Sequence, residues 1–511
     1  MAGLCDVVDK GSNRIAITIC VVLATLIQVL DTTIANVALP YMQGSVAASQ
    51  DEIAWVLTSY IAAAAIMTPP TGFFASRFGL KRLFLVSVAG FTFSSMLCGL
   101  ADSLTGVVLF RVMQGAFGAS LVPLSQSVLL GINPPERKGS AMALFGVAVM
   151  VGPVLGPVLG GWLTQNYSWR YVFYINLPIG VLAFLGMSCF LPNRAGDPNA
   201  RLDWFGFGTL SVAIGFFQIL LDRGEDLDWF GSGEILIEAI VAAAALYLFL
   251  VHTFTTRDPF VRPSLFKDRN FSAGMLFILV VGLTYYPSLA LQPPYLQELM
   301  NYPVVTSGIA MGPRGVGTMV AMIAVGRMTG RVDTRLLLGI GLVLSAWSFF
   351  AMTGWTPDIS EGEVMSVGVV QGIGRGFIFV PLSVVTLSTL PDAQRTEGAA
   401  LYSLSRNIGS SAGISIFNAL LLNNVQVNHA DIAQHVTAIN RAFGNPIVAR
   451  AWNLLSAAGR AALNAVVTQQ AQIIAYLDDY KLLLIATVAI LPLLLVFKRA
   501  PPGSGAHVMT E

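Results

Sequence analysis

The sequence predicts an all-α integral membrane protein with fourteen transmembrane helices. Three observations lead to that prediction. Hydrophobic residues make up 55% of the 511 residues and charged residues only 11%, whereas a soluble chain has about 25% charged residues. Apolar stretches of about 20 residues, the length that crosses a bilayer core, recur along the chain. An internal repeat divides these stretches into two similar halves.

The predicted helices are predominantly apolar runs bounded by polar or charged residues. They are expected at 15–38, 53–75, 83–101, 105–130, 139–163, 169–191, 204–221, 233–254, 271–293, 304–328, 335–355, 364–390, 397–422 and 481–497. The segment 423–480 is far longer than the other connections. Its end, AALNAVVTQQAQIIAYLDDY, has a helix-forming composition and is expected to extend the last helix.

Lysine and arginine lie mainly in every second connection and in the two tails, which predicts that both termini are cytoplasmic. The short connections on the other side hold only Arg170 and Arg223. Arginines in 423–480 do not contradict this orientation, because long segments are translocated regardless of charge. The net charge of +1 gives no indication of nucleic-acid binding.

Residues of the first half recur in the second half 254 or 257 positions later. The matching pairs are Gly72 and Gly326, Arg77 and Arg331, Gln114 and Gln371, Gly115 and Gly372, Gly152 and Gly409, and Gly156 and Gly413. The shift equals eight helices, so two six-helix halves flank two inserted helices. The predicted division is a cytoplasmic tail (1–14), an N-terminal half (15–191), the inserted helices (204–254), a C-terminal half (271–497) that includes a periplasmic segment (423–480), and a cytoplasmic tail (498–511).

The fifth predicted helix contains GVAVMVGPVLGPVLGGWL, in which several residues ordinarily weaken a helix. Gly152, Gly156 and Gly160 recur every fourth residue and form one face that a neighbouring backbone can approach closely. Pro153 and Pro157 are expected to bend the helix. The pattern predicts a moving, water-tight helix contact, and the alternative is a static packing seam.

Several stretches carry a resemblance to a known family. GPVLGPVLGG resembles the antiporter signature of major facilitator superfamily exporters. Further stretches resemble motifs of that superfamily or of its fourteen-span drug:proton antiporters: LDTTIANVALP (30–40), GFFASRFGLKR (72–82), RVMQGAFGAS from Arg111, WRYVFYINLPIG (169–180) and LYSLSRNIGSSAG from Leu401. The resemblance is greatest to EmrB-type multidrug exporters and covers almost the whole chain. It implies the superfamily fold and export driven by the proton gradient, without a cofactor.

These motifs imply a conformational role for a set of residues. The set is Gly72, Arg77, Gly79, Lys81, Arg82, Gln114, Gly115, Gly152, Pro153, Gly156, Pro157, Gly160 and Gly161. The loop motif normally has an aspartate before its arginine, but Ser76 precedes Arg77 here and offers no charge to a helix N-terminus. Arg77, Lys81 and Arg82 therefore have two interpretations, a latch between the halves or a positive-inside anchor.

Asp31 and Arg111 are ionisable residues inside the early helices. Each costs about 3 kcal/mol inside a bilayer on insertion scales, so they should face a cavity or each other. The first and fourth helices are neighbours in the resembled fold, so the pair is predicted to lie close together and to couple proton binding to transport. The alternative is that Asp31 forms structural hydrogen bonds at a helix end near Asn36.

The substrate cavity is expected between the halves near the bilayer midplane. Aromatic and amide side chains suit bulky amphipathic or cationic compounds. The candidates are Gln28, Asn36, Phe145, Tyr285, Tyr286, Gln292, Tyr402 and Arg406. Arg314, Arg375 and Arg406 have no evident acidic partner in the sequence. The glycines around Arg375 do not indicate a nucleotide loop, because no strand precedes them.

These features predict a proton-coupled multidrug efflux antiporter of the inner membrane, surrounded by lipid. An enzyme is not expected, because the sequence has no GxxxxGK[ST], GxSxG or HExxH motif, and no metal site is expected. The resemblance implies two partners, a periplasmic adaptor of the EmrA type and an outer-membrane channel of the TolC type, with 423–480 as a contact. The alternatives are a segment without a partner, a dedicated exporter of one siderophore or fatty acid, and a non-transporting sensor or scaffold.

Overall fold

The computed structural model describes residues 11–193, 196–225, 227–436, 452 and 456–497. Within these ranges thirteen helices are long and apolar enough to cross a membrane. The number is fourteen if Glu52–Met67 and Thr71–Phe78, which meet at a bend of 57°, count as one span. No β-strand occurs in the described part of the chain apart from an isolated bridge between Thr329 and Val332. The predicted all-α membrane fold is confirmed.

The N-terminal half contains six spans, three of which are interrupted. In chain order they are α2 (Gly11–Val46), α3 (Gln50–Met67) with α4 (Thr71–Phe78), α5 (Leu80–Leu100), α6 (Leu104–Gly118) with α7 (Leu121–Ile132), α8 (Pro135–Asn166), and α9 (Tyr171–Tyr174) with α10 (Asn176–Phe190). Polar caps define several starts. Ser49 and Glu52 form a capping box at α3, and Ser103 caps α6. Pro69 and Pro70 occupy the bend between α3 and α4, where proline disrupts helical hydrogen bonding.

The inserted helices and the C-terminal half follow the same rules. In chain order they are α11 (Trp204–Arg223), α12 (Gly233–Thr255), α13 (Arg269–Pro294) with the π-helix η4 (Tyr295–Leu299), α14 (Val304–Met328), α15 (Thr334–Met352), α16 (Glu361–Ser388), α17 (Arg395–Gln434), and α19 (Ala457–Ala489) with the 3₁₀-helix η6 (Leu491–Val496). Asp203, Asp268, Ser360 and Ser456 cap α11, α13, α16 and α19. Each predicted span falls on these elements, but α2, α17 and α19 extend well beyond the predicted 15–38, 397–422 and 481–497.

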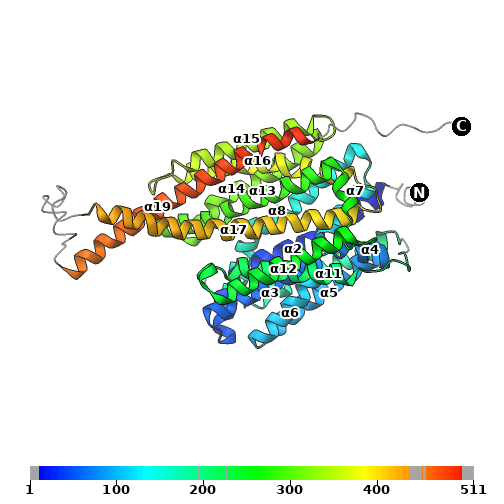
Figure 1. Ribbon diagram of the computed structural model, residues 1–511, viewed down its shortest axis with the longest axis horizontal. Helices are drawn as coiled ribbons and strands as arrows, with labels where there is room; N and C mark the ends of the chain where they lie inside the picture. Colours follow the sequence, from blue (N-terminus) through cyan, green and yellow to red (C-terminus); the bar gives the residue numbers. More distant parts are fainter. Residues whose placement is uncertain (1–10, 194–195, 226, 437–451, 453–455, 498–511) are drawn as a thin grey trace.

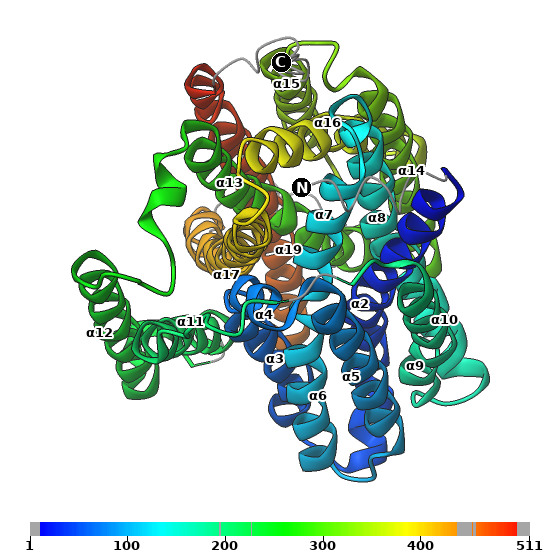
Figure 2. The ribbon, with the colours of Figure 1, turned by 90° about the vertical axis from the view of Figure 1, so that its right-hand side faces the viewer.

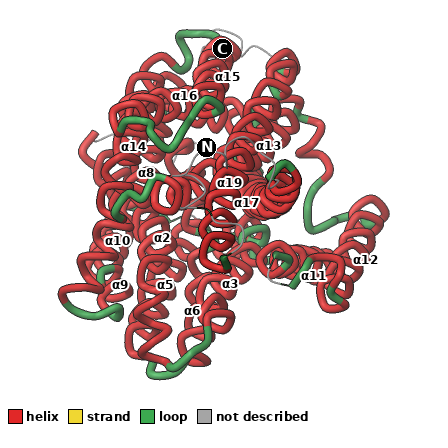
Figure 3. The backbone as a smooth tube through the Cα atoms, turned by 90° about the vertical axis from the view of Figure 1, so that its left-hand side faces the viewer, coloured by secondary structure: helices red, strands yellow, loops and turns green. Residues whose placement is uncertain are grey.

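The helices form a bundle elongated along their axes, with α11 and α12 at its periphery (Figures 2 and 3). One end, where α2 begins and η6 ends, is called the terminal end below. At the other end α17 and α19 project beyond the remaining helices, and this is called the hairpin end (Figure 1). In its described part, the expected long connection 423–480 belongs mostly to α17 and α19, and His429 and Asn464 are hydrogen-bonded across the two helices at 3.0 Å.

The two halves make contact toward the terminal end. Ser127 on α7 and Thr396 on α17 are hydrogen-bonded through their hydroxyls at 2.7 Å. A Cβ placed on Gly139 of α8 would lie 2.6 Å from the carbonyl oxygen of Gly326 on α14. The contact at Gly139 brings the backbones of α8 and α14 together, so the halves are closed against each other at this end.

Candidate functional site

An ion pair lies inside the N-terminal half, between α2 and α6. Nη1 of Arg111 is 2.6 Å from Oδ2 of Asp31, and both side chains are only 1% exposed. The other carboxylate oxygen of Asp31 accepts hydrogen bonds from Gln114 at 2.8 Å and from Asn176 at 2.9 Å. Each oxygen of the buried carboxylate therefore has at least one partner, as a charge inside an apolar bundle requires.

The guanidinium of Arg111 is held from several directions. Its Nε donates to the carbonyl of Val56 at 3.0 Å, and Nη1 also donates to Gln114 at 2.8 Å. The ring of Tyr60 lies over the guanidinium, with 4.2 Å from Cζ to the ring centroid, and the ring of Phe173 lies at 5.7 Å. These cation–π contacts add attraction in a site from which water is excluded.

The structure brings the predicted pair Asp31 and Arg111 together, and it does not place Asp31 at a helix end. Asp31 lies in the middle of α2, whereas Asn36 is exposed and belongs to a different face. Sequence reasoning did not select Asn176, which also donates to Ser95 at 3.0 Å. The available signal was an amide within an otherwise apolar helix.

A second polar group lies in the C-terminal half, where α13, α16 and α17 pack together. Cζ of Arg375 is 3.2 Å from the ring centroid of Tyr285 and 5.3 Å from that of Tyr286. Arg406 donates to the side chain of Asn407 at 3.4 Å. Nη1 of Arg375, as well as Nε and Nη1 of Arg406, has no hydrogen-bond partner among the described residues. Neither guanidinium has a carboxylate within 4.0 Å in that part of the chain.

The remaining cavity candidates do not form one site in this conformation. Phe145 is fully buried and stacks on Phe379 of the opposite half, with centroids 6.3 Å apart. Tyr402 is also fully buried. Gln292 accepts a hydrogen bond from Arg314, and Gln28 is half-buried. Helix packing covers Phe145 and Tyr402 in this conformation, and their place in a substrate cavity stays a prediction.

The comparisons with known proteins agree with this architecture. A sequence profile described as Major Facilitator Superfamily matches residues 21–414. The chain belongs to the Major Facilitator Superfamily. Two curated relatives resemble it over most of their length. The "Multidrug export protein EmrB" of Haemophilus influenzae is 38% identical over 84% of this chain and 85% of that protein. The "Fatty acid resistance protein FarB" of Neisseria gonorrhoeae is 36% identical over 84% of this chain and 85% of that protein.

Solved structures of the superfamily share the fold at low sequence identity. The human organic anion transporter MFSD10 (TETRAN) has a TM-score of 0.58 at 14% identity, over 93% of this chain and 99% of that chain. The proton:xylose symporter XylE has a TM-score of 0.59 at 14% identity, over 93% of this chain and 96% of that chain. At this identity the likeness concerns the fold alone.

In this superfamily member the glycines of the fifth span pack against α2. A Cβ on Gly152 would lie 2.8 Å from the carbonyl oxygen of Val29, and one on Gly156 would lie 2.7 Å from Cβ of Thr33. Gly160 contacts Ile34 in the same way. The glycine face therefore forms a seam within the N-terminal half, between its fifth and first spans.

The repeat reproduces this seam. A Cβ on Gly413 of α17 would lie 2.7 Å from the carbonyl oxygen of Leu283 on α13, and Gly409 packs against Leu279. Gly161, which does not belong to this predicted face, has nothing within 4 Å of an added Cβ, and its conformational role stays a prediction. The side chains of Pro153 and Pro157 lie outside the described part, and the bend that they predict stays a prediction.

The loop motif after the second span divides its contacts. Gly72 lies against Glu397 of the C-terminal half, where an added Cβ would be 2.7 Å from Cα. Arg77 instead donates to the carbonyl of Ala200 at 3.2 Å, and Lys81 to that of Ser188 at 2.7 Å. Both cations thus bind the end of the sixth span and the connection that follows it.

Two further residues complete the motif. Gly79 ends α4 with φ of 86°, a conformation that favours glycine. Arg82 is exposed. At this motif the contact between the halves is therefore made by Gly72. The charged side chains of Arg77 and Lys81 bind backbone carbonyls of the sixth span and of the connection after it.

Proposed function

We propose that this chain is a proton-coupled antiporter that exports lipophilic or amphipathic compounds by alternating access. The observation that carries the proposal is the buried pair of Asp31 and Arg111, with both polar groups fully engaged inside the half-bundle. The names of the relatives, which are multidrug export proteins, support the substrate class. The superfamily fold supplies two halves that can close at alternate ends.

The ion pair provides a physical link between a proton and the position of the helices. A proton on Asp31 removes the negative charge that balances Arg111, whose guanidinium then lies uncompensated in the bundle. Removing one partner of a buried pair costs about 3–5 kcal/mol, which is enough to shift a conformational equilibrium strongly. Proton binding at Asp31 therefore favours a rearrangement of α2 and α6, which together hold the pair.

Export in inverted membrane vesicles tests this function. Wild-type vesicles are expected to accumulate a fluorescent lipophilic cation and an uncharged lipophilic compound when a proton gradient is imposed. Asp31→Asn is expected to bind the same compounds but to lose the response to the gradient, because the amide cannot exchange a proton. Equal gradient-driven transport by the mutant and the wild type would exclude Asp31 as the coupling residue.

A second candidate is the export of amphipathic carboxylates such as fatty acids. The observation that favours it is the positive charge of Arg375 and Arg406, which no described carboxylate balances. A carboxylate head group can accept two parallel hydrogen bonds from a guanidinium. The relative named for fatty acid resistance is compatible with this preference. Binding of a long-chain carboxylate and of its matched alcohol, with Arg375→Gln as the variant, separates the two candidates.

Orientation and partners extend the proposal. The terminal end would face the cytoplasm, in keeping with the distribution of lysine and arginine, and the membrane would be the inner membrane. The projecting hairpin of α17 and α19 would then reach into the periplasm, where it offers a surface to an adaptor protein of a tripartite efflux system (Figure 1). Cysteine cross-linking from exposed positions such as Val427 to a co-expressed adaptor tests this arrangement.

A further inference from the structure

The C-terminal half contains an aromatic cluster that the proposed function does not use. Tyr295 of η4 lies at its centre, with ring centroids 5.8 Å from Trp355, 5.3 Å from Tyr476 and 6.3 Å from Tyr480. All four side chains are at most 5% exposed. The hydroxyls of Tyr295 and Tyr480 and the indole nitrogen of Trp355 have no hydrogen-bond partner in the described chain.

Asp479 of α19 carries a carboxyl group beside this cluster. It is fully buried, and neither of its oxygens has a hydrogen-bond partner among the described residues. It lies three positions after Tyr476 and four before Leu483, which packs in the same apolar core as the aromatic residues, so these three side chains share a helix face. An ionised carboxylate without a partner costs several kcal/mol in such surroundings, whereas the neutral acid costs far less.

The internal repeat shows that the C-terminal half differs from the N-terminal half in its charges. Gly115 packs against the carbonyl of Tyr60, and its counterpart Gly372 packs against the carbonyl of Arg314. Arg314 therefore occupies the place of Tyr60, while a glycine, Gly368, stands 257 positions after Arg111. Arg314 therefore lies on the second span of its half, whereas Arg111 lies on the fourth span of the other half.

Arg314 has no carboxylate within 4.0 Å among the described residues. Arg314 is 3% exposed, donates to Gln292, and has no partner at Nε or Nη1 in the described structure. It lies within electrostatic range of Tyr480, the residue next to Asp479. Gln371, the counterpart of Gln114, donates to a hydroxyl, that of Ser288, at 3.5 Å, instead of to a carboxylate. The C-terminal half thus holds a buried acid, Asp479, and a buried arginine, Arg314, neither of which has an ion-pair partner in the described structure.

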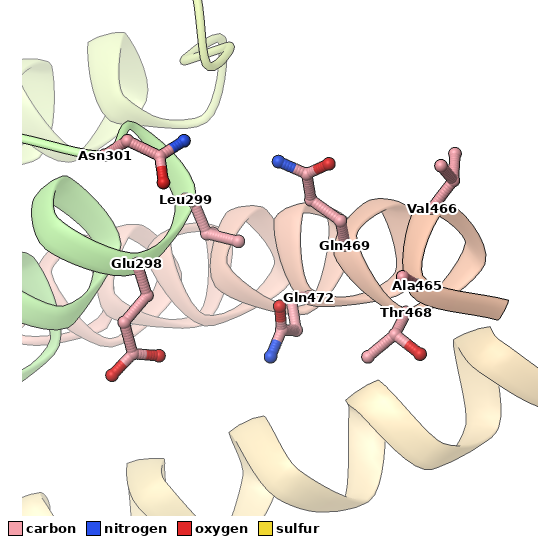
Figure 4. A pocket seen from close by; sticks show the side chains of 8 residues that line it. All are labelled: Glu298, Leu299, Asn301, Ala465, Val466, Thr468, Gln469 and Gln472. Atoms are coloured by element: carbon pink, nitrogen blue, oxygen red, sulfur yellow. The ribbon is translucent and has the colours of Figure 1, made fainter. Parts of the chain in front are cut away.

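A pocket lies on the hairpin side of this region. It has a volume of about 410 Å³ and lies between η4 and α19 (Figure 4). Its lining includes Glu298, Gln469 and Gln472. Gln472 precedes Asp479 by seven residues, which is two helical turns or about 10 Å. Of the residues of α19 that line the pocket, Gln472 is the nearest to the buried acid along the helix.

We propose that Asp479 is a second proton-binding site of this transporter and that it carries its proton in the conformation described here. The titratable groups beside it are Asp478, Tyr476 and Tyr480, all on α19. Glu298 of η4 lies near Tyr476, and Tyr295 of η4 and Arg314 of α14 lie near Tyr480. The helices α13, α15 and α17 contribute the apolar Leu291, Phe349 and Phe417 to the cluster. The role of Asp479 in transport rests on the proposed antiport function, whereas the binding of a proton by Asp479 does not.

Infrared difference spectroscopy of the purified full-length protein tests the proton site directly. A pH step should reveal the carbonyl stretch of a buried carboxylic acid, and Asp479→Asn should remove that band. Asp478→Asn is the matched control, because Asp478 is partly exposed and paired with Lys481 at 2.9 Å, and it should leave the band in place. Asp479→Glu should keep a shifted band. A band that Asp479→Asn leaves unchanged would overturn the proposal.

Proton stoichiometry in proteoliposomes tests the role in transport. The number of protons exchanged per substrate molecule, obtained from the reversal potential, should fall by one in Asp479→Asn and stay at the wild-type value in Asp478→Asn. An unchanged number in Asp479→Asn would reduce the residue to a structural one. If the wild type itself exchanges no protons, the proposed antiport function fails, and the infrared band still decides whether Asp479 binds a proton.

Discussion

At the scale of single residues, the two halves treat buried charge differently. In the N-terminal half Asp31 and Arg111 neutralise each other and their remaining polar atoms are bound by amides and a backbone carbonyl. In the C-terminal half, Arg314, Arg375 and Arg406 have no carboxylate within 4.0 Å among the described residues. The first arrangement suits a proton switch, and the second leaves positive charge for a ligand or for another conformation.

The cost of breaking the buried pair is the first prediction. Arg111→Gln should lower the free energy of unfolding by about 3–5 kcal/mol, because it leaves the Asp31 carboxylate buried without its cation. Thermal unfolding of the purified protein in detergent measures the effect. The control Lys481→Gln removes one partner of an exposed ion pair and should cost at most about 1 kcal/mol. Equal losses in both variants would contradict the assigned importance of burial.

The second prediction concerns Asp203, which precedes the membrane-spanning part of α11. Burial raises the pKa of its carboxyl, but hydrogen bonds from the backbone of Gly206, from His252 and from the backbone of Phe260 outweigh burial and lower the pKa. A carboxyl with a lowered pKa stabilises the fold above its unfolded pKa of about 3.9 and loses that contribution as the pH falls through the folded value.

Asp203→Asn should therefore lower the melting temperature at neutral pH, and the difference from the wild type should shrink as the pH falls below about 4. Melting curves across this pH range provide the measurement. Asp102→Asn, at an 89% exposed side chain, serves as the control and should show little difference at neutral pH. A difference for Asp203→Asn that is independent of pH would assign its effect to shape instead of charge.

At the scale of elements, close helix contacts depend on glycines that face another helix. A glycine of the same helix that faces open space does not contribute to the contact. Gly156 of α8 faces Thr33 of α2, whereas Gly161 of the same helix faces open space. The same seam occurs between α17 and α13 through Gly409 and Gly413. Each half therefore contains a close contact between its own fifth span and its own first span.

The third prediction uses one substitution at both positions. Gly156→Ala should destabilise the protein by about 1–3 kcal/mol, because its new Cβ would overlap Thr33 close to the backbone, where no rotation relieves the overlap. Gly161→Ala should be neutral or stabilising by up to about 1 kcal/mol, because alanine favours the helix and meets no atom. Denaturation of the two purified variants gives the comparison. A larger loss for Gly161→Ala would refute the assignment of the seam.

At the scale of the whole molecule, the conformation is one in which the halves close toward the terminal end. The contacts of Ser127 with Thr396 and of Gly139 with Gly326 cross between the halves there. Phe145 and Phe379 continue the contact deeper into the bundle. Alternating access requires these contacts to separate, because they join the two halves at this end.

The fourth prediction is that a covalent link at the terminal end stops transport. Cysteines at positions 127 and 396, in a background without the native cysteines, should form a disulfide, because the two hydroxyls that they replace are 2.7 Å apart. Oxidation should abolish export and a reductant should restore it. Cysteines at 87 and 120 form the control, since these hydroxyls are 2.6 Å apart within the N-terminal half. Export that continues after complete cross-linking at 127 and 396 would exclude this movement.

The fold could be predicted almost completely from the sequence. A bilayer core demands about 20 apolar residues and internal backbone hydrogen bonds, so each helix is visible as a run of local composition. Part of the site could be predicted in the same way. Asp31 and Arg111 stand out because charge is costly among apolar residues, and their motifs indicate adjacent helices.

The rest of the site depends on contacts between residues that are distant in the chain. Asn176 completes the hydrogen bonds of Asp31 from 145 positions away. Phe145 and Tyr402 are aromatic residues at plausible depths, yet packing buries them. Composition reports how apolar a segment is, and it does not report which neighbour covers a given side chain.

Asp479 shows the division most clearly. In the sequence it stands in AYLDDYK, just before the predicted last span and within the stretch that is expected to extend that helix, and nothing there distinguishes it from the adjacent Asp478. In the structure α19 begins at Ala457, and Asp479 is fully buried while the adjacent Asp478 is paired with Lys481 near the surface. The sequence by itself determined the helices, the repeat and the family, because these follow from local composition and from motifs. Only the tertiary structure decided which charges are neutralised and which acid is buried alone, because that depends on the side of each helix that a neighbouring helix covers.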